Sequence, residues 1–224
     1  MPATASLPTA PPRQRRKQAR PGELLGAALD LFVEKGYAAT RLDDVAARAG
    51  VSKGTLFLYY PSKEDLFKAV IHDSLAGRFD EWNAELEAYP GSSAELVRHC
   101  LHSWWERIGM TAASGITKLV LSEAGSFPEV ATYYQRHVIE PGHRLLRRVL
   151  QRGMDRGEFR PLDLEYAVYS LIAPMIFLLT WKHSLAPCCP PHQQIEPQTF
   201  IDTQVDLLLQ GMRVPPRPPD LPTP

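Results

Sequence analysis

The chain has 224 residues, of which 44% are hydrophobic, and its 25 Lys and Arg balance 25 Asp and Glu to a formal net charge of zero. That length is enough to bury a core in one or two domains. The three cysteines, Cys100, Cys188 and Cys189, are an odd number with one adjacent pair. This pattern argues against a disulfide framework and favours a reducing cytoplasm.

Charge is distributed unevenly along the chain. Residues 1–70 hold 11 basic and 7 acidic side chains, and the remainder holds 14 and 18. A basic amino-terminal third suggests a polyanionic partner. Within it, residues 1–20 are rich in Pro, Ala and Thr and then basic, so we predict a disordered arm that either contacts that partner or only keeps the chain soluble. No apolar segment follows the basic residues, which argues against a secretory signal.

The longest charge-free apolar stretch is residues 166–181, and it contains Pro174. Its sixteen residues are fewer than the roughly 20 that cross a bilayer. We therefore predict a buried helix and no membrane partner.

The first two elements show helical spacing of apolar residues. One helix is predicted from Pro21, a favourable first position, to Gly36. A second helix follows Thr40, which with Asp43 forms an acidic variant of the capping box. Gly50 ends this second helix.

The third predicted helix is short, because Ser52 caps it and Pro61 stops it. Two helices joined by a tight turn that contains glycine are typical of a helix-turn-helix. Ser62 and Asp65 then cap a fourth helix, which we predict to run to about Ala88 as one long element.

Helical spacing continues through the rest of the chain, without strand-like alternation of useful length. Helices are predicted near 92–109, 114–124, 128–153, 163–185 and 198–212. The fold class is therefore all-α, with about nine helices in an amino-terminal three-helix unit and a larger carboxy-terminal bundle. The predicted domains are a disordered basic arm (1–20), a helix-turn-helix domain (21–67), a ligand-binding and dimerisation domain (68–212) and a disordered Pro-rich tail (213–224).

The stretch VSKGTLFLYY, residues 51–60, has the features of a helix that reads DNA. In the major groove, Lys53 would lie at the edge, Gly54 would admit close approach and Thr55 would offer a hydroxyl and a methyl group. A glycine in a helix costs about 1 kcal/mol, which a purely structural helix has little reason to carry. The alternative is a helical hairpin whose apolar residues only pack together.

The segment RPGELLGAALDLFVEKGYAATRLDDVAARAGVSKGTLFLYYPSKEDLFKAV, residues 20–70, closely resembles the DNA-binding domain of the tetracycline-repressor (TetR) family of transcriptional regulators. The matching motifs GYAATRLDDVAARAGVSKGTL and PSKEDLF stand in the expected order and spacing, over about a quarter of the chain. The resemblance implies double-stranded DNA as a partner and a homodimer. The candidate DNA-binding residues are Thr40, Arg41, Ser52, Lys53, Gly54, Thr55, Phe57, Leu58, Tyr59 and Lys63.

Two positions depart from the family pattern. Phe57 stands where tyrosine is usual, and Leu58 stands where a polar or aromatic residue is often found. We therefore expect base readout to depend more on apolar contact and DNA shape. A two-fold dimer further predicts a palindromic operator, with recognition helices about 34 Å apart.

The larger half of the chain is predicted to form a dimer and to hold a small-molecule effector. Residues 163–185 are apolar over most of their surface and, with 198–212, fit a two-fold interface. Pro174 would interrupt its helix and free a carbonyl to face a pocket. Most aromatic and methionine side chains of this half are expected in the core, and a subset is expected to line a ligand cavity. The candidates are Trp82, Trp104, Trp105, Met110, Tyr133, Tyr134, Met175 and Phe177.

Two polar groups are weighed as metal or redox sites. His99, His102 and Glu106 share one helix face. Cys188 and Cys189 adjoin histidines and offer thiols to a soft metal or an oxidant. Because neither spacing matches a closed zinc pattern, we predict no metal and no cofactor.

The whole pattern favours a cytoplasmic transcriptional regulator that is not an enzyme. We predict a repressor that an apolar or amphipathic effector releases from DNA, and an activator is the nearest alternative. The main alternative from another class is a helical sensor or enzyme that depends on a metal or a thiol and whose amino-terminal helices are only structural. The chain contains no phosphate loop, HExxH or G-x-S-x-G motif, which weakens the enzyme alternative.

Overall fold

The computed structural model describes residues 12–214, with side chains from Pro21 onward, and divides the chain between Val70 and Ile71 into two compact units. Within the described residues the regular elements are helices, which confirms the all-α prediction, and an isolated bridge pairs Phe159 with Arg213. Residues 1–11 of the predicted arm and 215–224 of the predicted tail lie outside the described residues.

The amino-terminal unit is held together by a cluster of aromatic and aliphatic side chains. Phe32 meets Phe67 edge-on with ring centroids 4.7 Å apart, and Tyr37 lies 5.1 Å from Phe67. Val45 and Leu56 are fully buried. The helices are α1 (Pro12–Ala39), α2 (Leu42–Arg48), α3 (Lys53–Tyr59) and α4 (Lys63–Ser74).

The first helix begins earlier than predicted. It starts at Pro12 and passes through Pro21, so residues 12–20 of the predicted disordered arm are helical. Arg, Gln, Lys and Ala, which fill residues 13–20, are strong helix formers. Their combined preference outweighs the one backbone hydrogen bond that Pro21 removes. Gly36 interrupts the helix as predicted, with a φ of 82° that only glycine adopts readily.

The predicted Thr40–Asp43 capping box is wrong. Arg41 occupies the N-cap position of α2 and makes no side-chain capping bond. The Thr40 hydroxyl instead lies 2.7 Å from the Gly36 carbonyl oxygen and 3.2 Å from that of Leu31. Thr40 therefore hydrogen-bonds to carbonyl groups on either side of the interruption in α1 rather than to the start of α2.

The long helix predicted from Ser62 to Ala88 is divided in two. The Ser62 hydroxyl accepts from the Asp65 N–H at 3.0 Å, which confirms the predicted cap, but α4 ends at Ser74 and a tighter turn covers Ala76–Arg78. Gly77 lies in this turn, where a Cβ would come within 3.1 Å of the His72 carbonyl oxygen. A glycine weakens a helix, and here it marks the break.

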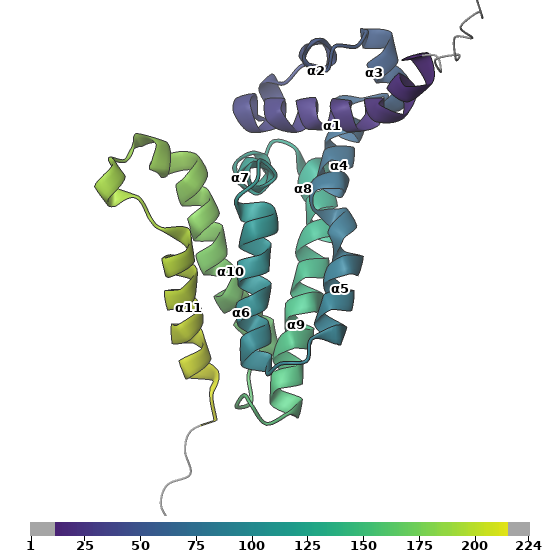
Figure 1. Ribbon diagram of the computed structural model, residues 1–224. Coiled ribbons are helices and arrows are strands. Elements are labelled where there is room, and N and C mark those ends of the chain that lie inside the picture. Colours follow the sequence, from purple (N-terminus) through teal and green to yellow (C-terminus); the bar gives the residue numbers. More distant parts are fainter. Residues whose placement is uncertain (1–11, 215–224) are drawn as a thin grey trace, which may run out of the picture. The chain divides into compact units, whose positions relative to one another are not determined.

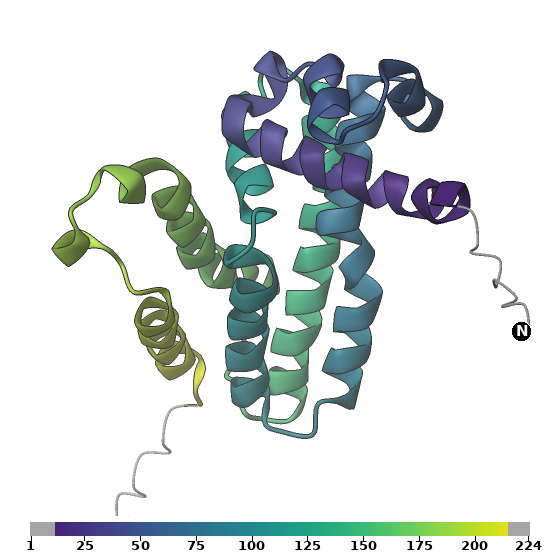
Figure 2. The same ribbon diagram turned by 45° about the horizontal axis from the view of Figure 1, so that its top comes forward.

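The carboxy-terminal unit, residues 71–214, is a helical bundle (Figures 1 and 2). In both views α5, α6 and α9 run side by side; α6 also packs on α11, and α10 contacts α7, α9 and α11. The helices are α5 (Phe79–Ala88), α6 (Ser93–Trp104), α7 (Ser114–Glu123), α8 (Pro128–Tyr134), α9 (Glu140–Asp155), α10 (Leu164–Thr180) and α11 (Pro197–Met212). Wider π turns extend three of them over Trp105–Gly109, Gln135–Ile139 and Trp181–Leu185.

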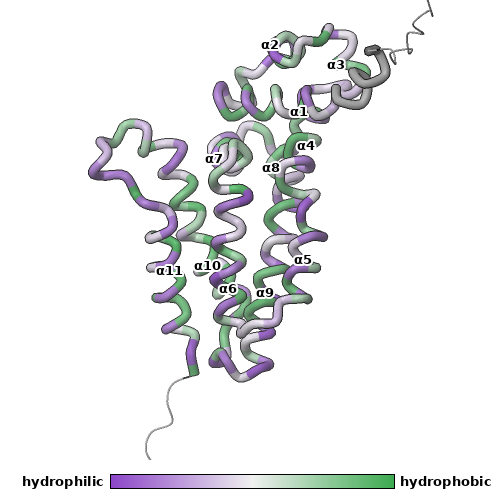
Figure 3. Tube along the Cα trace, viewed as in Figure 1, coloured by the Kyte–Doolittle hydropathy of each residue, from purple (hydrophilic) through white to green (hydrophobic). Residues whose placement is uncertain are grey.

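The apolar helix α10 is buried on one face only. Val168 and Leu171 are fully buried, whereas Tyr166 and Phe177 are exposed, and hydrophobic residues recur along the whole helix (Figure 3). Among the described residues, Leu164–Cys188 is long and apolar enough to cross a membrane, a criterion that core helices of other proteins also meet, and 28% of its most apolar window is buried in the chain. The prediction of a buried helix therefore holds for one face only. The helix also continues through Pro174, so the predicted interruption is wrong.

Close packing between α9 and the segment after it gives a stability prediction. A Cβ at Gly153 would lie 2.0 Å from the ring of the buried Phe159, so Gly153→Ala forces the ring or the helix to move. We expect a loss of about 1–3 kcal/mol in the free energy of unfolding, measured by urea denaturation.

The matched control for this prediction is Gly211→Ala. Gly211 is also helical and has no neighbour within 4 Å of an added Cβ among the described residues. The control should leave stability unchanged or raise it by up to about 1 kcal/mol. Equal stability of the two variants would contradict the packing described above.

Candidate DNA-binding surface and ligand cavity

The turn between α2 and α3 is set by backbone hydrogen bonds around Gly50. The Val51 N–H donates to the Ala46 carbonyl at 2.9 Å, and the Gly50 N–H donates to the Ala47 carbonyl at 3.1 Å. With Gly50 at a φ of 67°, these bonds form a Schellman motif. The motif reverses the chain within a few residues and thereby fixes where α3 begins.

One side of α3 is anchored and the other is exposed. The Ser52 hydroxyl caps the helix by accepting from the Thr55 N–H at 3.1 Å, and Leu56 is fully buried. The outer face, which we define as Lys53, Gly54, Phe57 and Leu58, is exposed to solvent. Leu58 is 80% exposed, so it contributes almost nothing to the core of its own unit.

Gly54 has no structural role within the described residues. Its φ is not positive, and an added Cβ would find only the Ser52 hydroxyl oxygen, at 3.9 Å. Alanine would therefore fit at this position and would favour the helix. The absence of a side chain here matters only to something that approaches α3 from outside.

Several basic side chains of this unit are paired with acids at its surface. The Lys53 ammonium lies 2.8 Å from Asp43, and the two side chains are 62% and 61% exposed. Arg48 pairs in the same way with Glu34 at 2.8 Å. Exposed pairs of this kind contribute at most about 1 kcal/mol, so a phosphate group can replace Asp43 as the partner of Lys53.

Two predicted DNA-binding side chains serve the unit itself. Thr40 is 1% exposed and is occupied at the end of α1. The Lys63 ammonium donates to the carbonyl oxygens of Tyr37 and Ala38 at 2.8 and 3.1 Å and lies over the Tyr37 ring. Contacts from the other candidates stay predictions. Arg41 and the outer face are exposed, Thr55 and Tyr59 are partly exposed, and the Thr55 hydroxyl lies 2.9 Å from that of Ser52.

The carboxy-terminal unit contains a cavity of about 600 Å³, which is the size of a site for a small molecule. Helices α5, α6, α9 and α10 supply most of its wall, and α7, α8 and the π turn after α8 complete it. The lining is mainly apolar, as in Trp82, Leu96, Leu146 and Ile172. Such a wall gives an apolar ligand shelter from water.

Only half of the predicted ligand residues line the cavity. Trp82, Trp104, Tyr134 and Met175 line the cavity. The other four do not line it: Trp105 is packed in the core, Met110 and Phe177 are exposed, and Tyr133 stacks on His137 with ring centroids 4.2 Å apart. Their aromatic character indicated burial or contact in general, and residue type alone does not distinguish a cavity wall from a filled core.

Several polar lining residues were missed by the sequence reasoning. His99 was weighed only as a metal ligand, yet it faces the cavity together with Ser103. Gln135 and His143 line it from the π turn after α8 and from α9. A signal is present in the sequence for Gln135 and His143, because apolar residues such as Val138, Ile139 and Leu146 stand three or four positions away.

The cavity lining includes groups that burial keeps protonated. Burial raises the pKa of Tyr134 to about 12, and its hydroxyl lies 2.8 Å from that of Thr117. Burial, with a smaller effect of the Glu85 charge, raises the pKa of the Cys100 thiol to about 12. Burial and the charge of Arg147 lower the pKa of His143. At neutral pH the phenol and the thiol are therefore uncharged, and the imidazole is biased toward its neutral form.

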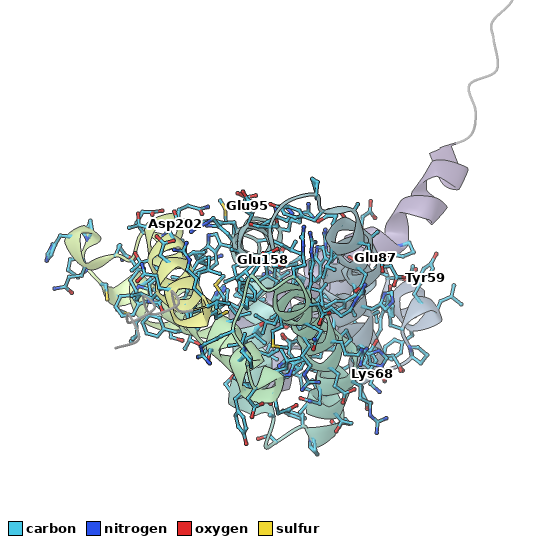
Figure 4. All side chains as sticks on the ribbon, turned by 90° about the horizontal axis from the view of Figure 1, so that it is seen from below. Tyr59, Lys68, Glu87, Glu95, Glu158 and Asp202 are labelled. Carbon is cyan, nitrogen blue, oxygen red and sulfur yellow. The ribbon has the colours of Figure 1, made fainter. Side chains whose placement is uncertain are left out.

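The metal hypotheses gain no support. Among the described residues, no group of three or more His, Cys, Asp or Glu side chains is placed to hold a metal ion. His102 bridges instead to α11, with ring nitrogens 2.8 Å from Gln198 and 3.0 Å from Asp202, which is labelled in Figure 4. Cys188 and Cys189 are free thiols.

Comparison with known proteins identifies the family. Residues 24–70 match the model of the bacterial regulatory proteins of the tetR family, and residues 90–187 match a tetracyclin repressor-like carboxy-terminal domain. The HTH-type transcriptional regulator YfiR of Bacillus subtilis is 30% identical over 67% of this chain and 73% of its own length. The chain belongs to the TetR family of helix-turn-helix DNA-binding transcriptional regulators.

Other relatives match the chain over different shares of its length. The regulator RutR of Escherichia coli is 42% identical over 38% of this chain, and the match covers 38% of RutR as well. The crystal structure of FadR from Bacillus subtilis in complex with stearoyl-CoA superposes with a TM-score of 0.63 at 17% identity, over 86% of this chain and 99% of that one. At that identity the likeness concerns the fold.

Burial of Cys100 predicts selective thiol chemistry. A thiolate is the reactive form, and a pKa of about 12 leaves Cys100 protonated until the pH approaches that value. We expect a disulfide reagent at pH 8 to modify the exposed Cys188 at least about a hundred times faster than Cys100. Single-cysteine variants, followed by absorbance, measure both rates, and urea-unfolded protein supplies the control in which the rates converge. Comparable rates in the folded protein would contradict the raised pKa of the partly buried Cys100.

Proposed function

We propose that this protein is a cytoplasmic repressor that binds a palindromic operator as a homodimer and leaves DNA when an apolar or amphipathic effector fills its cavity. The observation that carries this proposal is the outer face of α3. Lys53, Gly54, Phe57 and Leu58 stand exposed on a helix whose opposite side is fixed in the core. The family supplies the helix-turn-helix context in which such a face reads DNA.

The outer face has the chemistry for the major groove. Lys53 can exchange Asp43 for a phosphate or a guanine edge, and Gly54 lets the backbone approach the bases. Phe57 and Leu58 offer apolar surface to thymine methyl groups. We therefore expect an operator in which methyl contacts and DNA shape carry much of the specificity.

Exposed apolar surface on α10 and α11 supports the homodimer. Tyr166, Phe177 and Leu185 are 71%, 48% and 54% exposed along α10 and its π turn, and Leu207 of α11 is 60% exposed. Apolar surface of this extent commonly marks an interface. The same helices from a second copy would cover it, and a two-fold axis would then impose a palindromic operator.

The cavity supports control by an effector. Its volume suits a small molecule, and the structurally similar FadR holds stearoyl-CoA. An effector that favours the DNA-free conformer by about 10⁴-fold, or 5.5 kcal/mol, would change occupancy from 99% to 1%. Because α10 contributes both lining residues and exposed residues, a ligand on one face can alter the fit of a partner on the other.

The first prediction from this proposal concerns Gly54. Gly54→Ala should leave the free energy of unfolding unchanged or raise it by up to about 1 kcal/mol. It should weaken binding to genomic fragments selected by the wild-type protein by at least about tenfold, because the added methyl group holds backbone and bases apart. Fluorescence anisotropy over a range of salt concentrations measures the affinity, which should fall as salt rises.

The control for this variant is Gly26→Ala, an exposed helical glycine of α1 with no neighbour within 4 Å of an added Cβ among the described residues. It should gain helix stability in the same way and keep full affinity for DNA. Unchanged DNA affinity in Gly54→Ala would remove α3 from the interface.

A second prediction concerns the homodimer. Leu207→Glu places a charge on the proposed interface and should shift sedimentation from dimer to monomer without loss of helical circular dichroism, because Leu207 is exposed in the single chain. Met110→Glu is the matched control, since Met110 is 64% exposed but lies outside α10 and α11. A monomeric wild type, or a dimer that both variants keep, would contradict this interface.

A further inference from the structure

We propose that the effector of this protein is uncharged: a largely apolar molecule with one or two hydrogen-bonding groups, rather than a carboxylate, an acyl-CoA or an amine cation. This inference rests on the proposed function of the cavity as the effector site. It specifies the chemical class that the lining accepts.

The first argument is the absence of a cationic partner for an anion. Among the described residues that line the cavity, none is lysine or arginine, and the acidic residue is Glu85. A carboxylate or phosphate that enters this wall loses its hydration and gains no opposite charge in return, which is strongly unfavourable.

The carboxylate of Glu85 is already paired with a cationic side chain of the protein. Its carboxylate accepts from the Arg107 guanidinium at 2.8 Å. This hydrogen bond is the main cause of the raised pKa of Arg107. The two side chains are 35% and 32% exposed, so the pair is partly sheltered from water. An ammonium ligand would have to displace Arg107, whereas an uncharged ligand leaves the pair intact.

Several of the remaining polar lining residues are uncharged hydrogen-bonding groups. Cys100 and Tyr134 are held protonated by burial, and burial biases His143 toward its neutral form. His99 lies 3.4 Å from the hydroxyl of Ser103 through its Nε2. Such groups donate to and accept from a ligand hydroxyl or carbonyl without an ionic partner. They can therefore bind polar groups at a few points of a ligand, while the apolar lining contacts the rest of it.

The experiment compares ligands of one shape that differ in charge. The full-length protein is titrated at pH 7.5 with decan-1-ol, decanoate and decylammonium below their micelle concentrations. A compact trio of 1-adamantanol, adamantane-1-carboxylate and 1-adamantylammonium is titrated in parallel. Quenching of tryptophan fluorescence reports binding, since Trp82 and Trp104 line the cavity, and calorimetry confirms each affinity. In at least one trio we expect the alcohol to bind at least about ten times more tightly than either charged analogue.

A variant that fills the cavity shows where the probes bind. Gly142 lines the cavity from α9, and a Cβ there would meet only the Phe79 ring, at 3.8 Å. Gly142→Leu therefore projects into the cavity without a backbone clash and should abolish binding of the alcohol. Circular dichroism and thermal unfolding check that the variant is folded.

A second variant tests the role of Glu85. Glu85→Gln removes the carboxylate and leaves Arg107 nearby, so the preference for decan-1-ol over decanoate should fall at least about threefold. Glu87→Gln is the matched control on the same helix: Glu87 pairs with Arg148 at 2.8 Å and is not a lining residue. The same preference in both variants would show that Glu85 does not set the charge of the site and would overturn this step.

The outcomes separate the inference from the proposed function. Tighter binding of an alcohol that Gly142→Leu abolishes supports both. Equal or tighter binding of a charged analogue that Gly142→Leu abolishes overturns the uncharged class and leaves the effector cavity standing. Binding of no probe, or binding that survives Gly142→Leu, overturns the cavity as the effector site and the inference with it.

Discussion

The position of helix α3 in the amino-terminal unit depends on the burial of Leu56 in the core of that unit. Helix α3 has seven residues, too few to be stable alone in water. It exists because Leu56 is fully buried, Ser52 caps its start and the Gly50 turn delivers it from α2. With one side fixed in this way, the opposite side needs no internal contacts. That freedom is what permits a glycine and an 80% exposed leucine on the outer face.

In the carboxy-terminal unit, different faces of helix α10 likewise have different surroundings. Val168 and Leu171 enter the core, Ile172 and Met175 line the cavity, and Tyr166 and other large apolar residues are exposed. One helix therefore links the proposed ligand to the proposed partner subunit. A change in the packing of one face of α10 must also shift the side chains on its other faces, because close-packed interiors transmit displacement.

Local signals made much of the fold predictable from sequence. Ser52, Pro61 and Ser62 each act on their own neighbours, and the elements they mark begin or end as predicted. One prediction failed where a group of the preceding helix competed for the same side chain: Thr40 bonds to carbonyls of α1 rather than capping α2. The cavity was the least predictable feature. Helical spacing shows that Trp104 and Trp105 are both apolar positions, but only the packing of several helices determines which of them borders empty space.

The residues that identify the helix-turn-helix in the sequence fall into two sets with different physical roles. Thr40, Gly50 and Lys63 belong to the scaffold, since their hydrogen bonds or backbone conformation hold the ends of helices in place. Among the described residues, the polar and cation–π side-chain contacts of the outer face of α3 are the exposed pair of Lys53 with Asp43 and the position of the Lys53 ammonium over the Phe57 ring. The scaffold set therefore makes the domain recognisable, whereas the choice of operator lies with the outer face. Substitution of Phe57 or Leu58 should change which DNA is bound while the domain stays folded, because neither side chain supports the core.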